Sequence, residues 1–550
     1  MGGTPVIVLN QGASSNQGKE VRQGNIQAAI QIANMVKSSL GPRGMDKMLV
    51  DPVGDVVITN DGVTILDKID VEHPSAKMLI EVAKTQDKEC GDGTTTSVII
   101  AGELLKSATD LVEANVHPTT ISNGYKMAVE KALEKLEGLG MDVKPSDTKK
   151  LKDIAHTSMI SKIVSSSREH MADIGMKAIR AIAEESDGGF KVNLDNIQVV
   201  KKTGTSIEDS ELIEGVIINR GPVHPSMPKK IEKAKIALIS CGMEIKKTDV
   251  DAAVQIRDPS QFSEFLKEEE RMLEEMVEKV KKSGANVLFV QKGIDEIAQH
   301  YMAKAGIYSI RRIKKSDMKK LAASTGATIV NQLDDLDRSA LGQAKTVEAR
   351  KVGDEDMTFI TGCKNPKAVS ILLRGGTNYV LDEVERSLVD ALNVIAVTVE
   401  DGKMVPGGGA TFMELSMELR TYASTVGGRE QIAIDAYASA LEIIPRVLAE
   451  NAGLDPIDIL IDMRKAHKDG KKRHGVNVFK GKVSDMIKEN VIEPLRVTKQ
   501  ALSASTETAI LILRIDDVIA SRGGGPTGPM PEPGQYDIKG EGSEFDKEWA

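Results

Sequence analysis

The order of helical and strand-like patterns along the chain constrains the fold more than any other feature. Up to about residue 148, apolar residues recur mostly at helical spacing, interrupted by a hairpin pattern at Met48–Val50 and Val56–Thr59. From Asp401 onward the pattern is again almost entirely helical. Between these parts, strand-like and helical segments alternate, which predicts an α/β layer of its own. We therefore expect one domain made from both ends of the chain, with another inserted through a two-stranded connector.

A chain of 550 residues is also too long for one hydrophobic core, so two to four domains are expected. In the middle part, helices at Ile294–Ala305 and Ser316–Ser324 separate the last three of four predicted strands. These strands are Lys235–Ser240, Asn286–Gln291, Ile307–Ile313 and Ala327–Val330.

A long amphipathic helix is predicted between the first two of these strands. Asp258 is a good N-cap and Pro259 suits the first helical position, and the helix then runs to Gly284. Its apolar face is interrupted by charges at Glu268–Arg271. The helix either packs along its whole length on the sheet, or its first half projects and meets another subunit.

The C-terminal part carries a strand at Val369–Arg374 and several helices. The predicted helices are Tyr379–Ile395, Ala433–Ile444 and Asp458–His467, with one more opened by Gly407-Gly408-Gly409. The apolar run Ile510–Ile515 reads as a closing strand, and the stretch from Gly523 onward, rich in Gly, Pro and acids, as a disordered tail.

Composition excludes several classes of protein. The formal net charge of −9 and an aromatic content of only 3% argue against nucleic-acid binding, which favours basic and stacking surfaces. Three scattered cysteines suit a reducing compartment, and Cys90 reads as a small buried residue rather than a nucleophile. No stretch is apolar and long enough to span a membrane, and we expect a cytoplasmic protein.

The segment Gly91-Asp92-Gly93-Thr94-Thr95-Thr96 predicts an anion site. Its glycines allow close approach of the backbone, and the helix that follows offers free N–H groups and a positive dipole end. Asp92 would repel a bare phosphate but would hold a divalent cation that bridges to one. A Mg²⁺–nucleotide site is therefore expected. The loop nevertheless lacks the lysine of a Walker motif, and that motif occurs nowhere in the chain. A second glycine-led helix start, Gly407–Thr411, strengthens this interpretation.

Two further aspartates fit such a site. Asp61 lies in the turn Asn60-Asp61-Gly62, and turn formation alone could explain it. Asp390 lies within an apolar helical segment, where it either pairs with a buried cation, points into an active site, or faces solvent. With Asp92 on the metal, these carboxylates could orient and deprotonate water.

These residues bring the chain close to a known family. It resembles the group II chaperonins, most closely the archaeal thermosome subunits, over roughly residues 20 to 522. The segments that carry the resemblance are Leu40–Lys47, Thr59–Leu66, Gly91–Thr96, Val405–Gly409 and Ala449–Asp455.

The resemblance implies a multidomain α+β fold. The mostly helical equatorial ATPase domain would comprise 1–148 and 403–522, a small α/β intermediate domain 149–215 and 368–402, and an α/β apical domain 216–367, followed by the acidic tail 523–550. A helical protrusion at about 244–283 would act as a built-in lid, so that no separate lid co-chaperonin is needed. Identical or paralogous subunits would form two stacked rings around unfolded client proteins and couple ATP hydrolysis to lid closure.

Family roles are carried over position by position. Asp61 and Asp390 would place and activate the attacking water, and Asp92 would hold Mg²⁺. The nucleotide would be bound by Leu40, Gly41, Pro42, Gly93, Thr94, Thr95, Thr96, Lys162, Gly408, Gly409 and Glu493. Of these, Lys162 matches a γ-phosphate-sensing lysine and would couple hydrolysis to domain closure.

The chain also departs from the family pattern. Its tail is acidic instead of Gly/Met-rich, and Ile163–Ser167 differs from the small-residue run expected after Lys162. Two alternatives stay open beside the ATP-driven folding machine: a scaffold with the chaperonin fold and little hydrolysis, and a client-specific subunit of a hetero-oligomeric complex.

Overall fold

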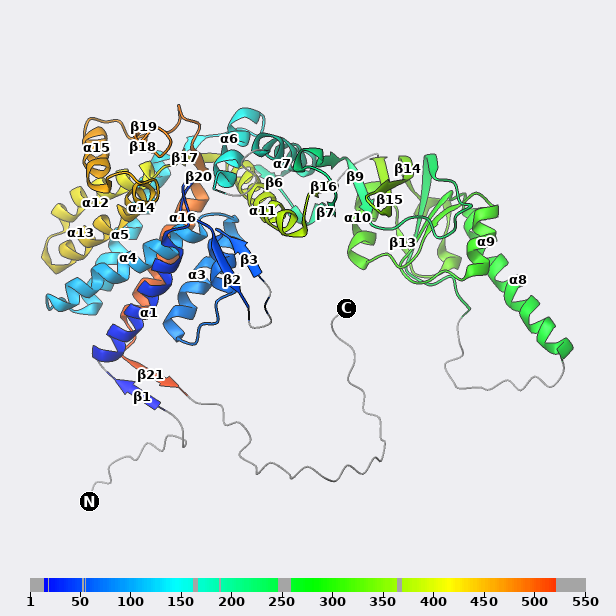
Figure 1. Cartoon of the computed structure of the whole chain (residues 1–550), viewed down its shortest axis with the longest axis horizontal. Helices are drawn as coiled ribbons and strands as arrows, with labels where there is room; N and C mark the ends of the chain where they lie inside the picture. The colour runs from blue at the N-terminus through cyan, green and yellow to red at the C-terminus, as the bar shows by residue number, and fades with distance from the viewer. Residues whose placement is uncertain are drawn as a thin grey trace, which may run out of the picture. The chain divides into compact units, whose positions relative to one another are not determined.

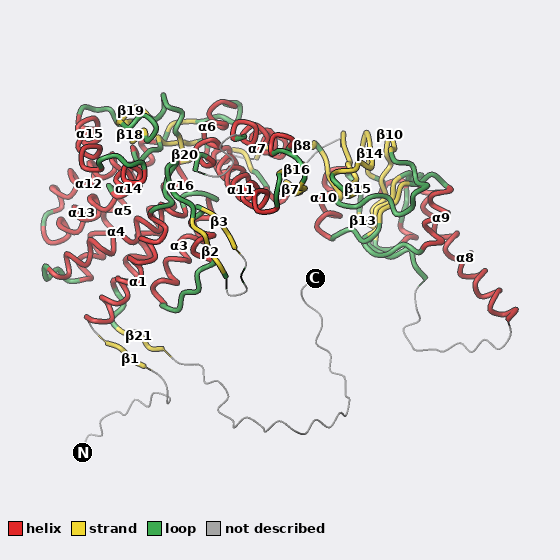
Figure 2. Tube along the Cα trace, viewed as in Figure 1, coloured by secondary structure: helices red, strands yellow, loops and turns green. Residues whose placement is uncertain are grey.

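The structure is a computed structural model that describes residues 14–17, 19–51, 54, 56–161, 167–186, 189–245, 259–363 and 368–520. Figures 1 and 2 show its helices and strands. The predicted N-cap Asp258, the predicted sensing residue Lys162 and the acidic tail lie outside the described residues. The chain divides into a small unit, Met1–Gly24 with Ile515–Ala550, and a large unit, Asn25–Arg514.

The small unit contains one antiparallel strand pair from the two ends of the chain. Strand β1 (Ser14–Gln17) pairs with β21 (Asp517–Ala520), with Ser14 opposite Ala520. Nearby, a guanidinium nitrogen of Arg22 lies 2.9 Å from Oδ1 of Asp516. The sequence patterns did not predict this pairing.

Helices from both ends of the chain form one bundle, as the nested pattern predicted. The first part contributes α1 (Lys19–Lys37), α2 (Gly62–Asp67), α3 (Pro74–Cys90), α4 (Thr94–Glu113) and α5 (Pro118–Leu139). The second contributes α12 (Ala410–Val426), α13 (Gly428–Leu441), α14 (Ile443–Asn451), α15 (Pro456–Lys468) and α16 (Leu495–Leu513). Two hairpins accompany them, β2 (Lys47–Val50) with β3 (Val56–Thr59) and β18 (His474–Asn477) with β19 (Lys482–Asp485).

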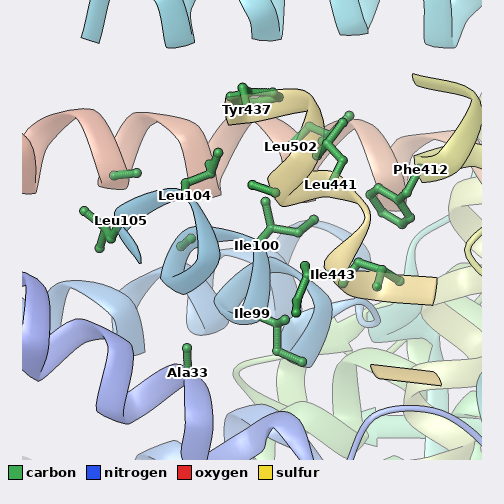
Figure 3. Packing of buried hydrophobic residues seen from close by; sticks show 14 of the residues in the cluster. Ala33, Ile99, Ile100, Leu104, Leu105, Phe412, Tyr437, Leu441, Ile443 and Leu502 are labelled. Atoms are coloured by element: carbon green, nitrogen blue, oxygen red, sulfur yellow. The ribbon is translucent and has the colours of Figure 1, made fainter. Parts of the chain in front are cut away.

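Helix α4 runs through the middle of the bundle core. Its residues Ile100, Leu104 and Leu105 are fully buried, and Figure 3 shows them among side chains of α12, α13, α14 and α16. Gly102 of α4 faces Ala33 of α1, where an added Cβ would lie 2.3 Å from the Ala33 Cβ. The helix that follows the glycine loop is therefore fixed on several sides, so that its first turn is held rigidly.

A second core contains helices and strands from two separate stretches. It combines α6 (Thr148–Met159) and α7 (Arg168–Ile182) with α11 (Asn378–Asp401), and Figure 1 shows these three helices side by side. Strand β16 (Val369–Gly375) pairs in parallel with β7 (Ile197–Thr203) and antiparallel with β8 (Glu211–Ile213), while β5 (Glu184–Ser186) and β6 (Gly189–Lys191) form a hairpin. The strand predicted at Val369–Arg374 is confirmed.

A small sheet joins this core to the bundle. Strand β17 (Lys403–Pro406) lies between β4 (Met141–Asp142) and β20 (Ile492–Pro494), antiparallel to both. Its register places Val405 opposite Glu493. Strands β4 and β17 lie where the chain passes between the two cores, and β20 directly precedes α16 of the bundle.

The middle of the chain forms a seven-stranded sheet in the order β12-β11-β10-β14-β15-β9, with β13 also on β10. The four predicted strands are confirmed, as β10 (Lys230–Ile239), β11 (Val287–Val290), β12 (Tyr308–Ile310) and β13 (Ile329–Val330). These pair in parallel, whereas β14 (Gly342–Val352), β15 (Glu355–Cys363) and β9 (Gly215–Ile218) are antiparallel. Helices α9 (Glu296–Lys304) and α10 (Lys315–Thr325) match the two predicted helices between the strands.

The long helix α8 (Pro259–Ser283) does not pack along its whole length on the sheet. Its second half packs through Leu273, Val277 and Val280, which are buried against the sheet side that also carries α9. Its first half exposes Phe265 and Leu266, and Figure 1 shows these turns extending past α9.

Several sequence predictions were wrong. The run Ile510–Ile515 is not a strand: its first four residues are the end of α16, with Ile512 and Leu513 fully buried, because a short apolar run looks the same in a buried helix and a buried strand. The single helix predicted at Ala433–Ile444 is divided between α13 and α14. None of the described helices is both long and apolar enough to cross a membrane.

Candidate active site

A cavity of about 770 Å³ opens in the large unit, between the helical bundle and helices α6 and α7. Almost all residues predicted for the site line it, although they come from distant parts of the sequence. They are Leu40, Gly41, Pro42, Asp61, Asp92, Gly93, Thr94, Thr95, Thr96, Gly408, Gly409 and Glu493.

The glycine loop has the geometry that its sequence predicted. Gly91 ends α3 with φ 68°, and Gly93 begins α4 with φ 79°, a left-handed region that favours glycine. Asp92 folds back, so that its Oδ1 accepts a hydrogen bond from the Gly93 N–H at 2.7 Å. No side chain caps the N-terminus of α4. Its first N–H groups and positive dipole end are thus presented to the cavity, which suits a phosphate.

A second helix start contributes to the same cavity. Gly409, with φ 75°, begins α12 without a side-chain cap, and Gly408 has φ 61°. An added Cβ on Gly408 would lie 2.6 Å from the Met486 sulfur, and one on Gly409 would lie 2.9 Å from the Pro445 Cβ. Glycine is therefore required at both positions for conformation as well as for space.

The loop Leu40–Pro42 is held by the segment Ala449–Asp455, whose role the sequence alone did not show. The Asn451 side-chain amide donates to the carbonyl oxygens of Lys37 at 3.1 Å and Leu40 at 2.9 Å. Leu448 covers Gly41 so closely that an added Cβ would lie 2.3 Å from its Cδ2. This contact fixes one wall of the cavity.

Asp61 caps a helix and also lies at the cavity. Its Oδ2 accepts hydrogen bonds from the Thr64 N–H at 3.0 Å and the Thr64 hydroxyl at 2.7 Å, which caps α2. The residue also lines the cavity. Directly after it, an added Cβ on Gly62 would lie 3.0 Å from the Thr95 backbone nitrogen, so Asp61 lies beside the start of α4.

Glu493 reaches the cavity through the register of β20 with β17. Burial, together with the nearby Asp92 carboxylate, raises the pKa of Glu493 to about 7. Near neutral pH this carboxyl group therefore changes between a hydrogen-bond acceptor and a donor.

Asp390 is placed differently from the other predicted residues. It is half-buried on α11 and is not among the residues that line the cavity. One turn later on the same helix, Asn393 contacts the glycine loop at Gly91. Ser161, which directly precedes Lys162, lines the cavity, while Lys162 itself lies outside the described residues.

The interpretation of Cys90 as a buried apolar residue is confirmed. Its side chain is 1% exposed, and burial raises its pKa to about 12. A thiol that stays protonated at neutral pH is a poor nucleophile.

The side chains at the cavity suit Mg²⁺ better than a metal whose ligands are all supplied by the protein. Nowhere in the described ranges do three His, Cys, Asp or Glu side chains gather as metal ligands. Mg²⁺ commonly takes one or two carboxylates and completes its shell with phosphate oxygens and water. Asp92, beside the uncapped start of α4, fits that pattern.

The sequence patterns missed one whole wall of the cavity. Helices α6 and α7 contribute Lys149, Lys152, His156 and Arg168, and the β18–β19 hairpin contributes Asn477, Phe479 and Lys480. They also missed Gln86, whose side-chain amide donates to the Asp92 carbonyl at 2.8 Å and to the Val497 carbonyl at 3.2 Å. No local motif marks these residues, since only the tertiary fold brings them together.

Comparison with known proteins agrees with this architecture. Residues 32–522 match the model of the TCP-1/cpn60 chaperonin family. The chain belongs to this family. It is 54% identical over 520 residues to a thermosome subunit of Methanopyrus kandleri, covering 94% of this chain and 95% of that one. It is 55% identical to the thermosome subunit beta of Thermoplasma acidophilum, over 94% of this chain and 96% of that one.

A solved chaperonin structure supports the fold as well. The open-state monomer of a group II chaperonin from Methanococcoides burtonii is 47% identical, with a TM-score of 0.60, covering 77% of this chain and 100% of that chain. The predicted resemblance to group II chaperonins of the thermosome type and the predicted multidomain α+β fold are thus confirmed.

Proposed function

We propose that this chaperonin chain binds ATP with Mg²⁺ in the cavity described above and hydrolyses it to drive the folding of client proteins. The observation that carries the proposal is the meeting of two uncapped helix starts, at Gly93 and Gly409, in one cavity that also holds Asp61, Asp92 and Glu493. Two positive helix ends in one enclosed space favour a polyanion such as a nucleotide.

Different residues of the cavity bind the nucleotide, hold the metal and activate the water. The first N–H groups of α4 bind phosphate oxygens, and Leu40–Pro42 and Gly408–Gly409 form walls around the rest of the nucleotide. Asp92 holds Mg²⁺, which neutralises phosphate charge when it is bound. Asp61 orients a water and accepts its proton through Oδ1, because its Oδ2 is already engaged by Thr64.

Asp390 completes this proposal from the neighbouring helix. Asn393 lies against Gly91, and Asp390 lies one helical turn before it on α11. We assign it a share in activating water once α11 and the loop close on the nucleotide. Lys162 retains its proposed role as a γ-phosphate sensor.

The domain boundaries and the assembly also belong to the proposal. The bundle would be the equatorial domain, the core of α6, α7 and α11 the intermediate domain, and the seven-stranded sheet with α8 the apical domain and its lid. Relatives named as alpha and beta thermosome subunits support assembly with identical or paralogous subunits. The exposed Phe265 and Leu266 on α8 suit contact with clients or with a neighbouring subunit.

The decisive experiment compares two aspartates of α11. Asp390→Ala should abolish single-turnover ATP hydrolysis and leave ring assembly intact in negative-stain images. Asp382→Ala, which removes an exposed carboxylate paired with Lys201 at 2.7 Å, should leave both unchanged. Normal turnover in Asp390→Ala would overturn its assignment, and absence of turnover in the unchanged chain would favour the scaffold alternative. Rings formed by the chain alone would argue against an obligate hetero-oligomeric subunit.

A further inference from the structure

The wall of the cavity formed by α6 and α7 carries several cations that the glycine loop lacks. Those lining it are Lys149, Lys152, His156 and Arg168, while Lys480 lines it from the β18–β19 hairpin. A phosphate site without a loop lysine needs positive charge from elsewhere. The structure allows these candidates to be separated by what each already contacts.

Most of these cations already have an ion-pair partner or are poorly suited to bind a phosphate. Lys152 forms an ion pair with Asp173, and Lys480 lies 2.7 Å from Glu489. Lys149 is exposed, so water solvates its charge well. Burial and the nearby Arg168 lower the pKa of His156, which keeps this imidazole neutral at pH 7.

Arg168 is different because its charge is partly buried and poorly compensated. Its guanidinium lies 3.4 Å from Nε2 of His156 and donates to the Ile160 carbonyl at 3.5 Å, and its Nε is buried without a hydrogen-bond partner. Within the part of the chain that the structure describes, no carboxylate forms an ion pair with it. Burial accordingly lowers its pKa. A partly desolvated cation without a counter-ion gains strongly when an anion arrives.

A series of contacts places Arg168 at the phosphate end of the cavity. Its guanidinium bonds the Ile160 carbonyl, and the next carbonyl, of Ser161, accepts a hydrogen bond from the Asn60 side chain. Asn60 adjoins Asp61 and Gly62, and Gly62 lies against the Thr95 backbone nitrogen at the start of α4. The turn at 160–161 therefore connects Arg168 to the elements that would surround the terminal phosphate.

We propose that Arg168 binds the terminal phosphate of the nucleotide, pairing its planar guanidinium with two phosphate oxygens. This inference rests on the proposed function. The planar fork suits bidentate contact with phosphate, which a lysine cannot reproduce. Because Arg168 opens α7, whose Met171 and Ile179 are buried in the second core, the contact ties the nucleotide to that core. ATP, which has the terminal phosphate, is then held more tightly than ADP.

Calorimetric titration with Mg²⁺ and either ADP or a non-hydrolysable ATP analogue tests this directly. Arg168→Gln should weaken the analogue about tenfold or more, the loss expected for a charged hydrogen bond, and ADP by less than about threefold. The affinity of Arg168→Lys for the analogue should lie between that of the unchanged protein and that of Arg168→Gln, since lysine keeps the charge but loses the planar fork of the guanidinium. Arg180→Gln, which removes an exposed arginine from the same helix, should change neither affinity.

Thermal unfolding of the nucleotide-free variants separates binding from a structural role. Removing an uncompensated charge should leave the melting temperature unchanged or raise it, whereas a structural arginine would lower it. The inference would be overturned if Arg168→Gln or Arg168→Lys lost affinity equally for both nucleotides, or if neither affinity changed. If the unchanged chain binds neither nucleotide, it is the proposed function that fails.

Discussion

Gly91 and Asn393 lie so close together that a Cβ added to Gly91 would be 2.3 Å from the Asn393 Cβ. Gly91 ends α3 and opens the glycine loop, while Asn393 belongs to α11 in the other core. The absence of a side chain at Gly91 is therefore what allows the two cores to meet beside the start of α4.

Gly91→Ala should destabilise the protein more than an otherwise equivalent substitution. Gly326→Ala is the matched control, since Gly326 also ends a helix with φ 74° but has no atom within 4 Å of an added Cβ. Gly326→Ala should cost only the left-handed strain, about 1 kcal/mol. Gly91→Ala adds a clash with the Asn393 side chain, for roughly another 1–3 kcal/mol. Equal melting temperatures for the two variants would contradict this contact.

Gln86→Leu should weaken nucleotide binding without direct contact to the nucleotide. The fully buried Gln86 joins the Asp92 and Val497 carbonyls, and leucine removes both hydrogen bonds, at about 1–3 kcal/mol in total. The loop then loses its support, so affinity for ADP measured by calorimetry should fall. Gln299→Leu is the control, because the buried Gln299 similarly donates to the Ile294 carbonyl at 2.7 Å but lies on α9. It should lower the melting temperature and leave the affinity unchanged; a loss of affinity in both variants would show a general folding effect.

Local signals explain which parts of the fold could be predicted. The glycine loop, α4 and the β2–β3 hairpin are encoded by neighbouring residues, and the structure has them where the patterns put them. Strand β14 was missed because charged residues such as Lys345, Glu348 and Arg350 are spread along it, and the exposed side of an antiparallel strand looks like a loop. The apolar end of α16 was read as a strand because the exposed Leu511 is as apolar as its buried neighbours Ile510 and Ile512, so the sequence shows no helical period.

The same limit applies to the site. Gly93 and Gly409 indicate helix starts in the sequence itself, so these two parts of the cavity wall could be predicted from local signals. Gln86 and Asn451 bond partners far away in sequence, and Arg168 reaches the cavity through the tertiary placement of α7, so nothing around them in the chain marks these positions. The contacts of such residues can be identified only once the hydrogen bonds and burial of the folded chain are known.

Two substitutions of Asp61 should separate its structural role from its proposed chemical role. Asp61→Asn keeps an oxygen that can accept from Thr64 and should retain the stability of α2, whereas Asp61→Ala loses the cap at about 1 kcal/mol. Both lose the carboxylate that would take a proton from water, so both should lack hydrolysis in single-turnover assays. Hydrolysis by Asp61→Asn at the normal rate would exclude Asp61 as the base.

Glu493 should make stability depend on pH in a direction opposite to that of most acids. Its folded-state pKa of about 7 lies above the ordinary value of 4.5, because burial and Asp92 disfavour the charge. Below pH 4.5 the group is protonated in both folded and unfolded chains and costs nothing. Between pH 4.5 and 7 only the unfolded chain gives up the proton, so stability falls as pH rises, and the penalty is constant above pH 7.

Glu493→Gln should remove this penalty. Measured without metal or nucleotide, its melting temperature relative to the unchanged protein should rise between pH 5 and pH 8, by the equivalent of roughly 1–3 kcal/mol. Glu489→Gln gives the opposite control at the same cavity, because the hydrogen bond from Lys480 lowers the pKa of Glu489 and stabilises the folded state at higher pH. Its relative melting temperature should therefore fall as pH rises toward 4.5 and stay constant between pH 5 and pH 8, where Glu489 is ionised in both the folded and the unfolded chain. A difference for Glu493→Gln that stays constant from pH 5 to pH 8 would mean that this carboxyl group titrates as an ordinary surface acid.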